Sequence, residues 1–389
     1  MTTARELSAA FRSLHGSEPK IYRAPGRVNI IGEHTDYNDG FVMPAAIDFS
    51  TWVAISPRDD RLISVFSENF REQLSFSLDD TAAQARGQWS DYVRGVAVTL
   101  EQSGYRLRGA ELHIRGDVPI GSGLSSSAAI EVATGLALLR NSGLSVDRAE
   151  LAQLCQRAEN EFVGMRCGIM DQFVSCLGQP GKALLLDCRA LAHELLSLPE
   201  EVRLVICNTM VKHKLAAGEY NQRRAECEAG ISQLARSLPR VGALRDVSEA
   251  DLESRKDGMT EVVYRRCRHV ITENNRVLEA KKALENDNLP KLGRLMNESH
   301  QSLRDDYEVS CAELDIMVGL AQQMPNVYGA RMTGAGFGGC TINLVTAQAA
   351  DEFRRVIARD YEAATGIAAE IYVCRAAAGA REVTQDLQE

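Results

Sequence analysis

The sequence contains no apolar run long enough to cross a membrane. A membrane-spanning helix needs about 20 consecutive apolar residues, and no stretch of the 389 residues approaches that length. Residues 1–14 carry charges at Arg5, Glu6 and Arg12 and have no apolar segment, so they do not resemble a signal peptide. We therefore expect a cytoplasmic protein.

Positive charge is also scarce. The chain has 44 Lys and Arg against 53 Asp and Glu, a net charge of −9. An acidic chain repels nucleic acid and anionic lipid, so we expect neither nucleic acid nor a membrane as a partner. A nucleotide can still bind where backbone donors and Mg²⁺ supply a local positive potential.

The ten cysteines form no C-x-x-C motif, which excludes a zinc knuckle and a thioredoxin motif. Several lie in apolar surroundings, such as Cys207 after residues 204–206. We expect reduced, mostly buried cysteines, with a disulfide framework as the alternative. The sequence also lacks internal repeats and low-complexity tracts.

The chain is longer than the ~250–300 residues at which a single core stops growing, so two domains are expected. Strand-like patterns occur at residues 51–55, 110–115, 183–187, 202–207, 340–345 and 370–374. Helical spacing occurs at residues 125–139 and 151–162, and helix-forming residues predominate from 215 to about 324. A turn at residues 178–181 divides the chain into expected domains 1–180 and 181–389.

A glycine- and serine-rich run, PIGSGLSSSA, occupies residues 119–128. Glycines let the backbone approach a ligand closely, and the serines open a predicted helix whose first-turn N–H groups suit a phosphate. One serine hydroxyl could also join a Mg²⁺ shell completed by carboxylate, water and phosphate. The alternative is a glycine turn with a serine N-cap. A Walker A loop is excluded, because Gly181-Lys182 is followed by Ala183 rather than Ser or Thr.

A second glycine cluster, at residues 334–339, matches the G-x-G-x-x-G pattern literally. A dinucleotide-binding fold requires a helix after this pattern, whereas residues 340–345 predict a strand. The Rossmann interpretation is therefore disfavoured. A loop that closes over phosphates and a tight hairpin without function both remain open.

Two further segments carry polar groups next to apolar residues. Glu33, His34 and Asp36 follow a strand-like run, and together they could bind a metal or several sugar hydroxyls. Asp171 follows an apolar turn, and Glu159 lies late in an amphipathic helix. A carboxylate in such a setting needs a partner or a raised pKa, as a catalytic base does. The alternatives are a solvated loop for the first segment and a helix-capping aspartate for the second.

Together these segments resemble the GHMP kinase family, and within it the kinases that act on galactose. The family has a Pro-Gly-Arg segment near the N-terminus, a GxGLSSSA phosphate motif and a late glycine loop, and this chain has all three in that order. Three runs are similar to the galactose kinases in particular: residues 26–37, 167–172 and 219–224. Mevalonate and homoserine kinases lack the Glu-His-Thr-Asp-Tyr portion of the first run.

The resemblance implies an α+β, two-domain GHMP kinase fold. The N-terminal domain would hold a mixed sheet with helices, the C-terminal domain would be ferredoxin-like, and the active site would lie in the cleft between them. The implied reaction transfers the γ-phosphoryl group of ATP to the anomeric hydroxyl of galactose, the first committed step of galactose metabolism. Mg²⁺ is the implied cofactor, galactose and ATP are the implied small-molecule partners, and a monomer is the implied assembly.

The resemblance also implies a role for individual positions. Asp171 resembles the catalytic base, and Arg27 resembles the arginine that pairs with it and stabilises charge on the phosphoryl group. The positions implied for sugar binding are Glu33, His34, Thr35, Asp36, Gly168 and Tyr220. Those implied for phosphate binding are Gly121, Ser122, Gly123, Leu124, Ser125, Ser126 and Ser127, and those implied for Mg²⁺ are Ser127 and Glu159. Trp89, Tyr92 and Val93 resemble an adenine-side segment, and residues 334–339 resemble the third family motif.

Two alternatives accompany this interpretation. The first is a GHMP kinase for another sugar, such as N-acetylgalactosamine or L-arabinose, because loops outside the motifs shape the sugar pocket. The second is a sensor that binds galactose and ATP without catalysis. The known non-catalytic relative lacks two residues of the GLSSSA stretch, whereas Ser127 and Ala128 are present here, which favours catalysis.

Overall fold

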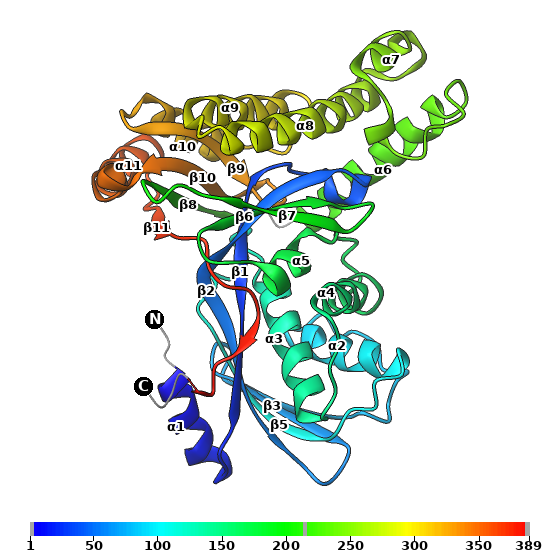
Figure 1. The fold of residues 1–389 in the computed structure, drawn as a ribbon, viewed down its shortest axis with the longest axis vertical. Coiled ribbons are helices and arrows are strands. Elements are labelled where there is room, and N and C mark those ends of the chain that lie inside the picture. Colours follow the sequence, from blue (N-terminus) through cyan, green and yellow to red (C-terminus); the bar gives the residue numbers. More distant parts are fainter. Residues whose placement is uncertain (1–3, 213–215, 386–389) are drawn as a thin grey trace.

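The strands form two sheets that lie one beyond the other along the long axis of the molecule (Figure 1). A computed structural model describes residues 4–212 and 216–385. Within this part of the chain, one sheet has eight strands and the other has four. The bounds of the strands are β1 (Lys20–Ile31), β2 (Phe41–Pro57), β3 (Leu62–Ser67), β4 (Glu72–Ser77), β5 (Ala110–Gly116), β6 (Lys182–Asp187), β7 (Ala192–Ser197), β8 (Val202–Lys212), β9 (Val327–Thr333), β10 (Gly338–Thr346), β11 (Glu370–Cys374) and β12 (Arg381–Glu382).

The larger sheet is mixed and depends on both halves of the sequence. Six of its strands have the order β12-β1-β2-β5-β3-β4. The other two are β6, which pairs with β2, and β7, which pairs with β6. The β3–β5 pair is parallel, whereas β1–β2 and β2–β5 are antiparallel. The smaller sheet has the order β11-β8-β10-β9 and is antiparallel throughout. This arrangement confirms the expected mixed N-terminal sheet and α+β class.

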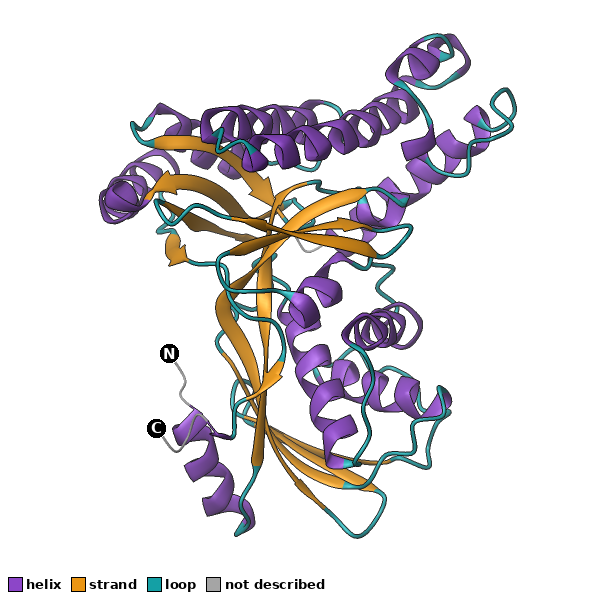
Figure 2. Cartoon of the chain, viewed as in Figure 1, coloured by secondary structure: helices purple, strands orange, loops and turns teal. Residues whose placement is uncertain are grey.

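Helices lie on both faces of the larger sheet, because α1 packs against Ile21 and Ala54 on the face opposite to α2–α5 (Figure 2). Four of them, α2 to α5, pack beside the larger sheet, and α8 and α9 run together across the end of the molecule next to the smaller one (Figure 1). The bounds are α1 (Ala4–His15), α2 (Ser90–Gln102), α3 (Ser126–Asn141), α4 (Arg148–Arg157), α5 (Met170–Leu177), α6 (Ala216–Leu234), α7 (Glu249–Glu253), α8 (Glu261–Glu285), α9 (Leu289–Asp305), α10 (Ala312–Gln323) and α11 (Ala350–Thr365).

The expected elements at residues 51–55, 110–115, 183–187, 202–207, 340–345 and 370–374 are all strands, and residues 126–139 are helical. The helix predicted over 151–162 is correct to Arg157, after which the chain turns into a π-helical segment, Ala158–Val163. The helix-rich region is present from residue 216, and residue 215 lies outside the described residues. No helix of the described residues is long and apolar enough to cross a membrane.

A shared apolar core joins the two halves of the chain. One cluster of buried residues combines Ile30 of β1 and Met43 of β2 with Val277 of α8, Met296 of α9 and Ile342 of β10. Because each of these side chains is fully buried, separating the halves would expose much apolar surface, at about 25 cal/mol per Å². The segments that leave β1 and β10 are therefore held at fixed positions relative to each other.

All ten cysteines are free thiols, as expected from the sequence. Seven are buried and three are partly buried. Burial raises the pKa of the Cys155 thiol and of the Cys207 thiol, the latter to about 12. A buried thiol of this kind behaves as a small apolar side chain rather than as a nucleophile.

Candidate active site

A cavity of about 550 Å³ is lined by four loops that are far apart in the sequence. They are the segment after β1, the glycine- and serine-rich run before α3, the segment that leads into α5, and the glycine cluster between β9 and β10. A cavity of this size is within the usual range for small-molecule sites. The predicted motifs are thus brought together by the tertiary structure.

The phosphate motif forms a turn with unusual backbone angles. Gly121 and Gly123 have φ of 69° and 84°, values that glycine adopts at no steric cost. Ser125 also lies in the left-handed region, with φ of 59°, which is uncommon for a residue with a Cβ. Helix α3 begins at the next residue, Ser126, so its unpaired first-turn N–H groups lie at the cavity.

The late glycine cluster packs its backbone directly on this turn. A Cβ on Gly334 would lie 3.0 Å from the carbonyl oxygen of Gly123, and one on Gly339 would lie 2.9 Å from that of Ser122. Larger residues would therefore push the two loops apart. Strand β10 follows the cluster, as expected, and not the helix that a dinucleotide-binding motif requires.

Arg27 and Asp171 form a bidentate ion pair at the centre of the cavity. The Arg27 Nε and Nη2 atoms each donate to one carboxylate oxygen at 2.7 Å, and Nη1 donates to the carbonyl oxygen of Gly123 at 2.5 Å. The Ser125 hydroxyl donates to Asp171 Oδ2 at 2.5 Å. Arg27 is 6% exposed and Asp171 is 22% exposed, and both line the cavity, so the carboxylate is the more accessible member. One arginine thereby joins Asp171 to the phosphate loop.

The expected sugar-binding residues are found at the same cavity as this pair. Glu33, His34, Asp36, Gly168 and Tyr220 all line the cavity. Gly168 lies against Asp36, since a Cβ there would be 2.0 Å from Asp36 Oδ2. Burial, together with the nearby Asp171 carboxylate, raises the pKa of Asp36 to about 7.

His34 is held between two groups at the edge of the cavity. Its Nε2 atom lies 3.2 Å from the carbonyl oxygen of Ala335, and its Nδ1 atom lies 2.8 Å from the Tyr37 hydroxyl. A carbonyl oxygen can only accept, so Nε2 carries the proton and Tyr37 donates to Nδ1. Burial lowers the pKa of His34 to about 3, which agrees with this neutral form. The histidine therefore links the sugar segment to the late glycine cluster.

Ser127 and Glu159, the expected Mg²⁺ positions, also line the cavity. Glu159 lies in the π-helical turn, a feature often found at functional sites. Burial and the Asp171 charge raise the pKa of Glu159 to about 7, and a hydrogen bond from Ser127 opposes the rise. A hydroxyl and a carboxylate are hard oxygen donors that fit Mg²⁺, and a cation would offset the crowded negative charge. The described residues hold no cluster of three or more His, Cys, Asp or Glu side chains arranged for a metal, so water and phosphate would have to complete the shell.

Four of the expected positions do not line the cavity with their side chains. Thr35 is fully buried, with its hydroxyl 2.8 Å from the carbonyl oxygen of Gly32. Ser122 donates to the carbonyl oxygen of Pro119 at 2.7 Å. Leu124 and Val93 are fully buried in the apolar core. These four residues therefore belong to the surroundings of the cavity and not to its lining.

Several residues at the site were not anticipated from the sequence. Gln172 donates to Glu159 at 2.6 Å and to Glu131, which is fully buried, at 3.0 Å. Phe70 stacks on Trp89 with ring centroids 5.3 Å apart and an interplanar angle of 5°, and both rings line the cavity. Gln172 directly follows Asp171 and could have been found from that position. Glu131 and Phe70 carry no local sequence signal.

Comparison with protein families gives three matches along the chain. Residues 9–57 match the galactokinase galactose-binding signature, residues 91–179 match the GHMP kinase N-terminal domain, and residues 280–363 match the GHMP kinase C-terminal domain. The first match contains Arg27 and the segment after β1, and the second contains the phosphate motif and Asp171.

Individual proteins are similar over nearly the whole chain. A galactokinase of Chloroflexus aggregans is 50% identical over 374 residues, covering 96% of each chain, and one of a Roseiflexus species is 47% identical, covering 98% of each. Among solved structures, the galactokinase of Lactococcus lactis in complex with galactose is 39% identical and has a TM-score of 0.94, over 98% of this chain and 100% of the other.

Proposed function

The chain belongs to the galactokinase family of GHMP kinases, and on this basis we propose roles for the residues that line its cavity. The protein phosphorylates galactose with ATP, giving galactose 1-phosphate and ADP. The two-domain GHMP kinase fold expected from the sequence is confirmed by the match to the Lactococcus lactis structure.

The observation that best supports the catalytic roles is the bidentate Arg27–Asp171 pair beside the phosphate loop. We propose that Asp171 accepts the proton of the anomeric hydroxyl while that oxygen bonds to the γ-phosphorus and the bond to the β-phosphate oxygen breaks. A positioned base contributes about 10²–10⁴-fold to the rate. Arg27 would orient Asp171 and stabilise negative charge on the transferred group.

We assign the remaining expected positions to the sugar, the phosphates and the adenine. Glu33, His34, Asp36, Gly168 and Tyr220 would bind the sugar, because they line the same cavity as Asp171, whose charge acts on the Asp36 carboxylate. Residues 121–127 would bind the phosphates through the backbone N–H groups at the start of α3. Trp89 and Tyr92 also line the cavity and would border the adenine. Alignment of the two substrates in this way can remove up to ~7–11 kcal/mol of the barrier.

We propose Mg²⁺ as the cofactor, held by Ser127 and Glu159 together with ATP. Bound there, it would supply positive charge to the phosphate oxygens. Gln172 would hold the Glu159 carboxylate in place, since its amide bridges Glu159 and Glu131. We also propose a monomer, a division of the chain near residue 180, and the cytoplasm as its compartment, where ten free thiols are normal.

The proposal is tested with a coupled assay that follows ADP release, with Mg²⁺, across galactose, glucose, N-acetylgalactosamine, L-arabinose and mevalonate. We expect turnover of galactose well above the others, with the product phosphorylated at C1 by NMR. Preference for another sugar would overturn the substrate and leave the phosphoryl transfer. Binding of galactose and ATP without turnover would overturn the catalytic roles in favour of a sensor.

A further inference from the structure

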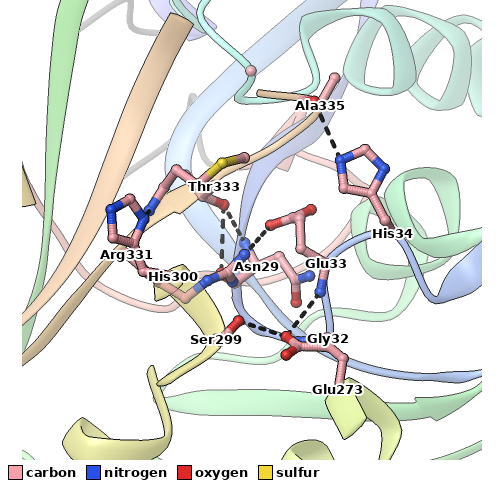
Figure 3. Close-up of polar contacts among 12 residues, drawn as sticks. Asn29, Gly32, Glu33, His34, Glu273, Ser299, His300, Arg331, Thr333 and Ala335 are labelled. Atoms are coloured by element: carbon pink, nitrogen blue, oxygen red, sulfur yellow. Dashed lines mark hydrogen bonds and ion pairs between the residues drawn. The ribbon is translucent and has the colours of Figure 1, made fainter. Parts of the chain in front are cut away.

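Buried residues from the second half of the chain form hydrogen bonds with β1 and with the sugar-binding segment that follows it. Arg331 lies on β9 and is fully buried. Its Nη2 atom donates to Glu33 Oε2 at 2.7 Å, and its Nη1 atom donates to the carbonyl oxygen of Asn29 at 2.9 Å (Figure 3). Arg331 does not line the cavity, whereas Glu33 does. The guanidinium therefore acts on the cavity through Glu33.

The planar guanidinium suits this double contact. One edge reaches the Glu33 carboxylate and the other reaches the backbone of β1, so the carboxylate is fixed relative to the strand that carries it. A carboxylate has about four acceptor positions, so the bonds from Arg331 and the Gly334 N–H leave capacity for a ligand hydroxyl. Burial raises the pKa of Glu33, and the neighbouring charges of Arg331 and Arg27 oppose that rise.

Glu273 of α8 holds the backbone of the same segment. Its Oε1 atom accepts the N–H groups of Gly32 and Glu33 at 2.9 and 3.3 Å and the hydroxyl of Ser299 at 2.6 Å (Figure 3). Glu273 is fully buried. Burial would raise its pKa, but the Arg276 guanidinium, 2.6 Å from Oε2, and its other neighbours lower it to about 2. The carboxylate is therefore charged and acts purely as an acceptor.

His269, one turn before Glu273 on α8, adds a third contact. Its Nε2 atom lies 3.1 Å from the carbonyl oxygen of Glu33, and its Nδ1 atom lies 2.9 Å from the Ser302 hydroxyl. Since the carbonyl can only accept, Nε2 donates to the carbonyl oxygen of Glu33. The N–H, C=O and carboxylate of Glu33 are each bonded to a different buried side chain from the second half of the chain.

We propose that Arg331 and Glu273 are positioning residues that fix Glu33 for recognition of a sugar hydroxyl, and so set the affinity for galactose and the discrimination among sugars. This inference rests on the proposed role of Glu33 in sugar binding. Arg331 is fully buried and donates a charge-assisted hydrogen bond to Glu33, so the carboxylate would lose that bond if it moved. A hydroxyl displaced from the carboxylate would lose its partner, and buried sites built to bond a hydroxyl reject analogues that lack it.

The test compares Arg331→Lys and Arg331→Met with the wild-type protein in the steady state and by calorimetry with galactose. We expect Arg331→Met to raise the KM and Kd for galactose about 10- to 100-fold, the usual worth of a hydrogen bond to a charged group, while the KM for ATP stays within about 3-fold. Arg331→Lys keeps the positive charge but lacks the planar guanidinium that bonds to two acceptors at once. Its affinity for galactose should therefore lie between those of Arg331→Met and the wild-type protein.

Arg266→Met is the matched control, because Arg266 is 2% exposed, pairs with Glu226 and Glu308 at 2.7 and 2.6 Å, and does not line the cavity. It should lower the melting temperature without changing the galactose KM. If Arg331→Met and Arg331→Lys lose stability as Arg266→Met does and keep wild-type galactose affinity, Arg331 is merely structural and the proposal fails.

A double-mutant cycle separates Arg331 from Glu33. Because Arg331→Met leaves a buried carboxylate unpaired, Arg331→Met/Glu33→Gln removes both charges and provides a variant without that penalty. If Arg331 acts through Glu33, the double variant should bind galactose about as weakly as Glu33→Gln alone. Additive losses would overturn the proposal. Glu273→Leu should also raise the galactose KM, and Glu273→Gln, which keeps the acceptor oxygen, should raise it less.

A panel of monodeoxygalactoses, each lacking one hydroxyl, then tests which hydroxyl the protein recognises through Glu33. Wild-type protein should discriminate strongly against the sugar that lacks the hydroxyl bound by Glu33, and Arg331→Lys should lose discrimination at that position only. An equal loss at every position would contradict positioning of Glu33. Should wild-type protein bind galactose without phosphorylating it, the proposed function fails, and the calorimetric affinities still decide the role of Arg331.

Discussion

Replacing Gly168 with alanine should damage galactose binding through a single contact. The added Cβ would lie 2.0 Å from Asp36 Oδ2, 2.2 Å from its Cγ and 2.8 Å from its Cβ. Real Cβ atoms essentially never approach other atoms closer than 3.0 Å, so the Asp36 carboxylate must move by about 1 Å. The φ angle of Gly168 lies outside the left-handed region, so the backbone itself tolerates alanine.

A misplacement of about 1 Å in a binding group costs about 10²-fold, or roughly 2.7 kcal/mol of transition-state stabilisation. We therefore expect kcat/KM for galactose to fall about 100-fold in Gly168→Ala, because Asp36 lines the cavity. The KM for ATP should change little, since the three atoms nearest to the added Cβ all belong to Asp36. The coupled ADP assay, with each substrate varied in turn, measures both quantities.

Gly319→Ala is the control for the chemical change alone, because Gly319 lies in α10 and a Cβ there meets no atom within 4 Å. It should match the wild-type protein in both constants. Melting temperatures of the two variants show whether Gly168→Ala remains folded. If it is folded and its kcat/KM for galactose lies within about 2-fold of wild type, Asp36 does not contact the sugar from the position described and the reasoning is refuted.

Three further outcomes are expected. Asp171→Asn should lower kcat by about 10²–10⁴-fold, because it removes the base, while Ser125→Ala, which keeps the carboxylate, should lower it far less in the same assay. Glu159→Gln should raise the Mg²⁺ concentration for half-maximal activity by about 10-fold or more, since Mg²⁺ prefers carboxylate ligands, and Mn²⁺ binding followed by EPR should weaken in parallel. His269→Gln should alter the pH dependence of stability, because burial lowers the pKa of His269 to about 4. Its folded pKa lies below its ordinary value of 6.5, so the unfolded chain takes up the extra proton and the stability that His269 provides is lost as pH falls from 6.5 towards 4. Urea unfolding across that window should show the wild-type advantage over the variant shrinking.

Each of these has a result that would contradict it. Near-normal turnover in folded Asp171→Asn would remove the base assignment and favour a loose transition state that needs no base. An unchanged Mg²⁺ requirement in Glu159→Gln would place the metal elsewhere. A stability difference between wild type and His269→Gln that does not vary with pH would show that His269 is not held neutral in the fold.

The loops that meet at the cavity were predictable from the sequence because their chemistry is local. A glycine turn followed by serines at the start of a helix suits phosphate wherever it is placed, and residues 119–128 form that structure. The same applies to the strand predicted at residues 340–345, which disfavours a dinucleotide fold and is part of β10. Glu33, His34 and Asp36 were recognisable as a polar cluster, although their partner groups were not.

Tertiary structure decided which groups surround these loops. Glu33 and Arg331 are separated by 298 positions, and Gly32 and Glu273 by 241, so no local pattern connects them. In the sequence Arg331 is an ordinary charged residue, and its complete burial follows only from the packing of β9 against α9, α10 and β1. A charged side chain is kept in such a place by its partners. The sequence by itself therefore determined which segments could hold phosphate and sugar, and the packing of the two halves determined how each of their side chains is held.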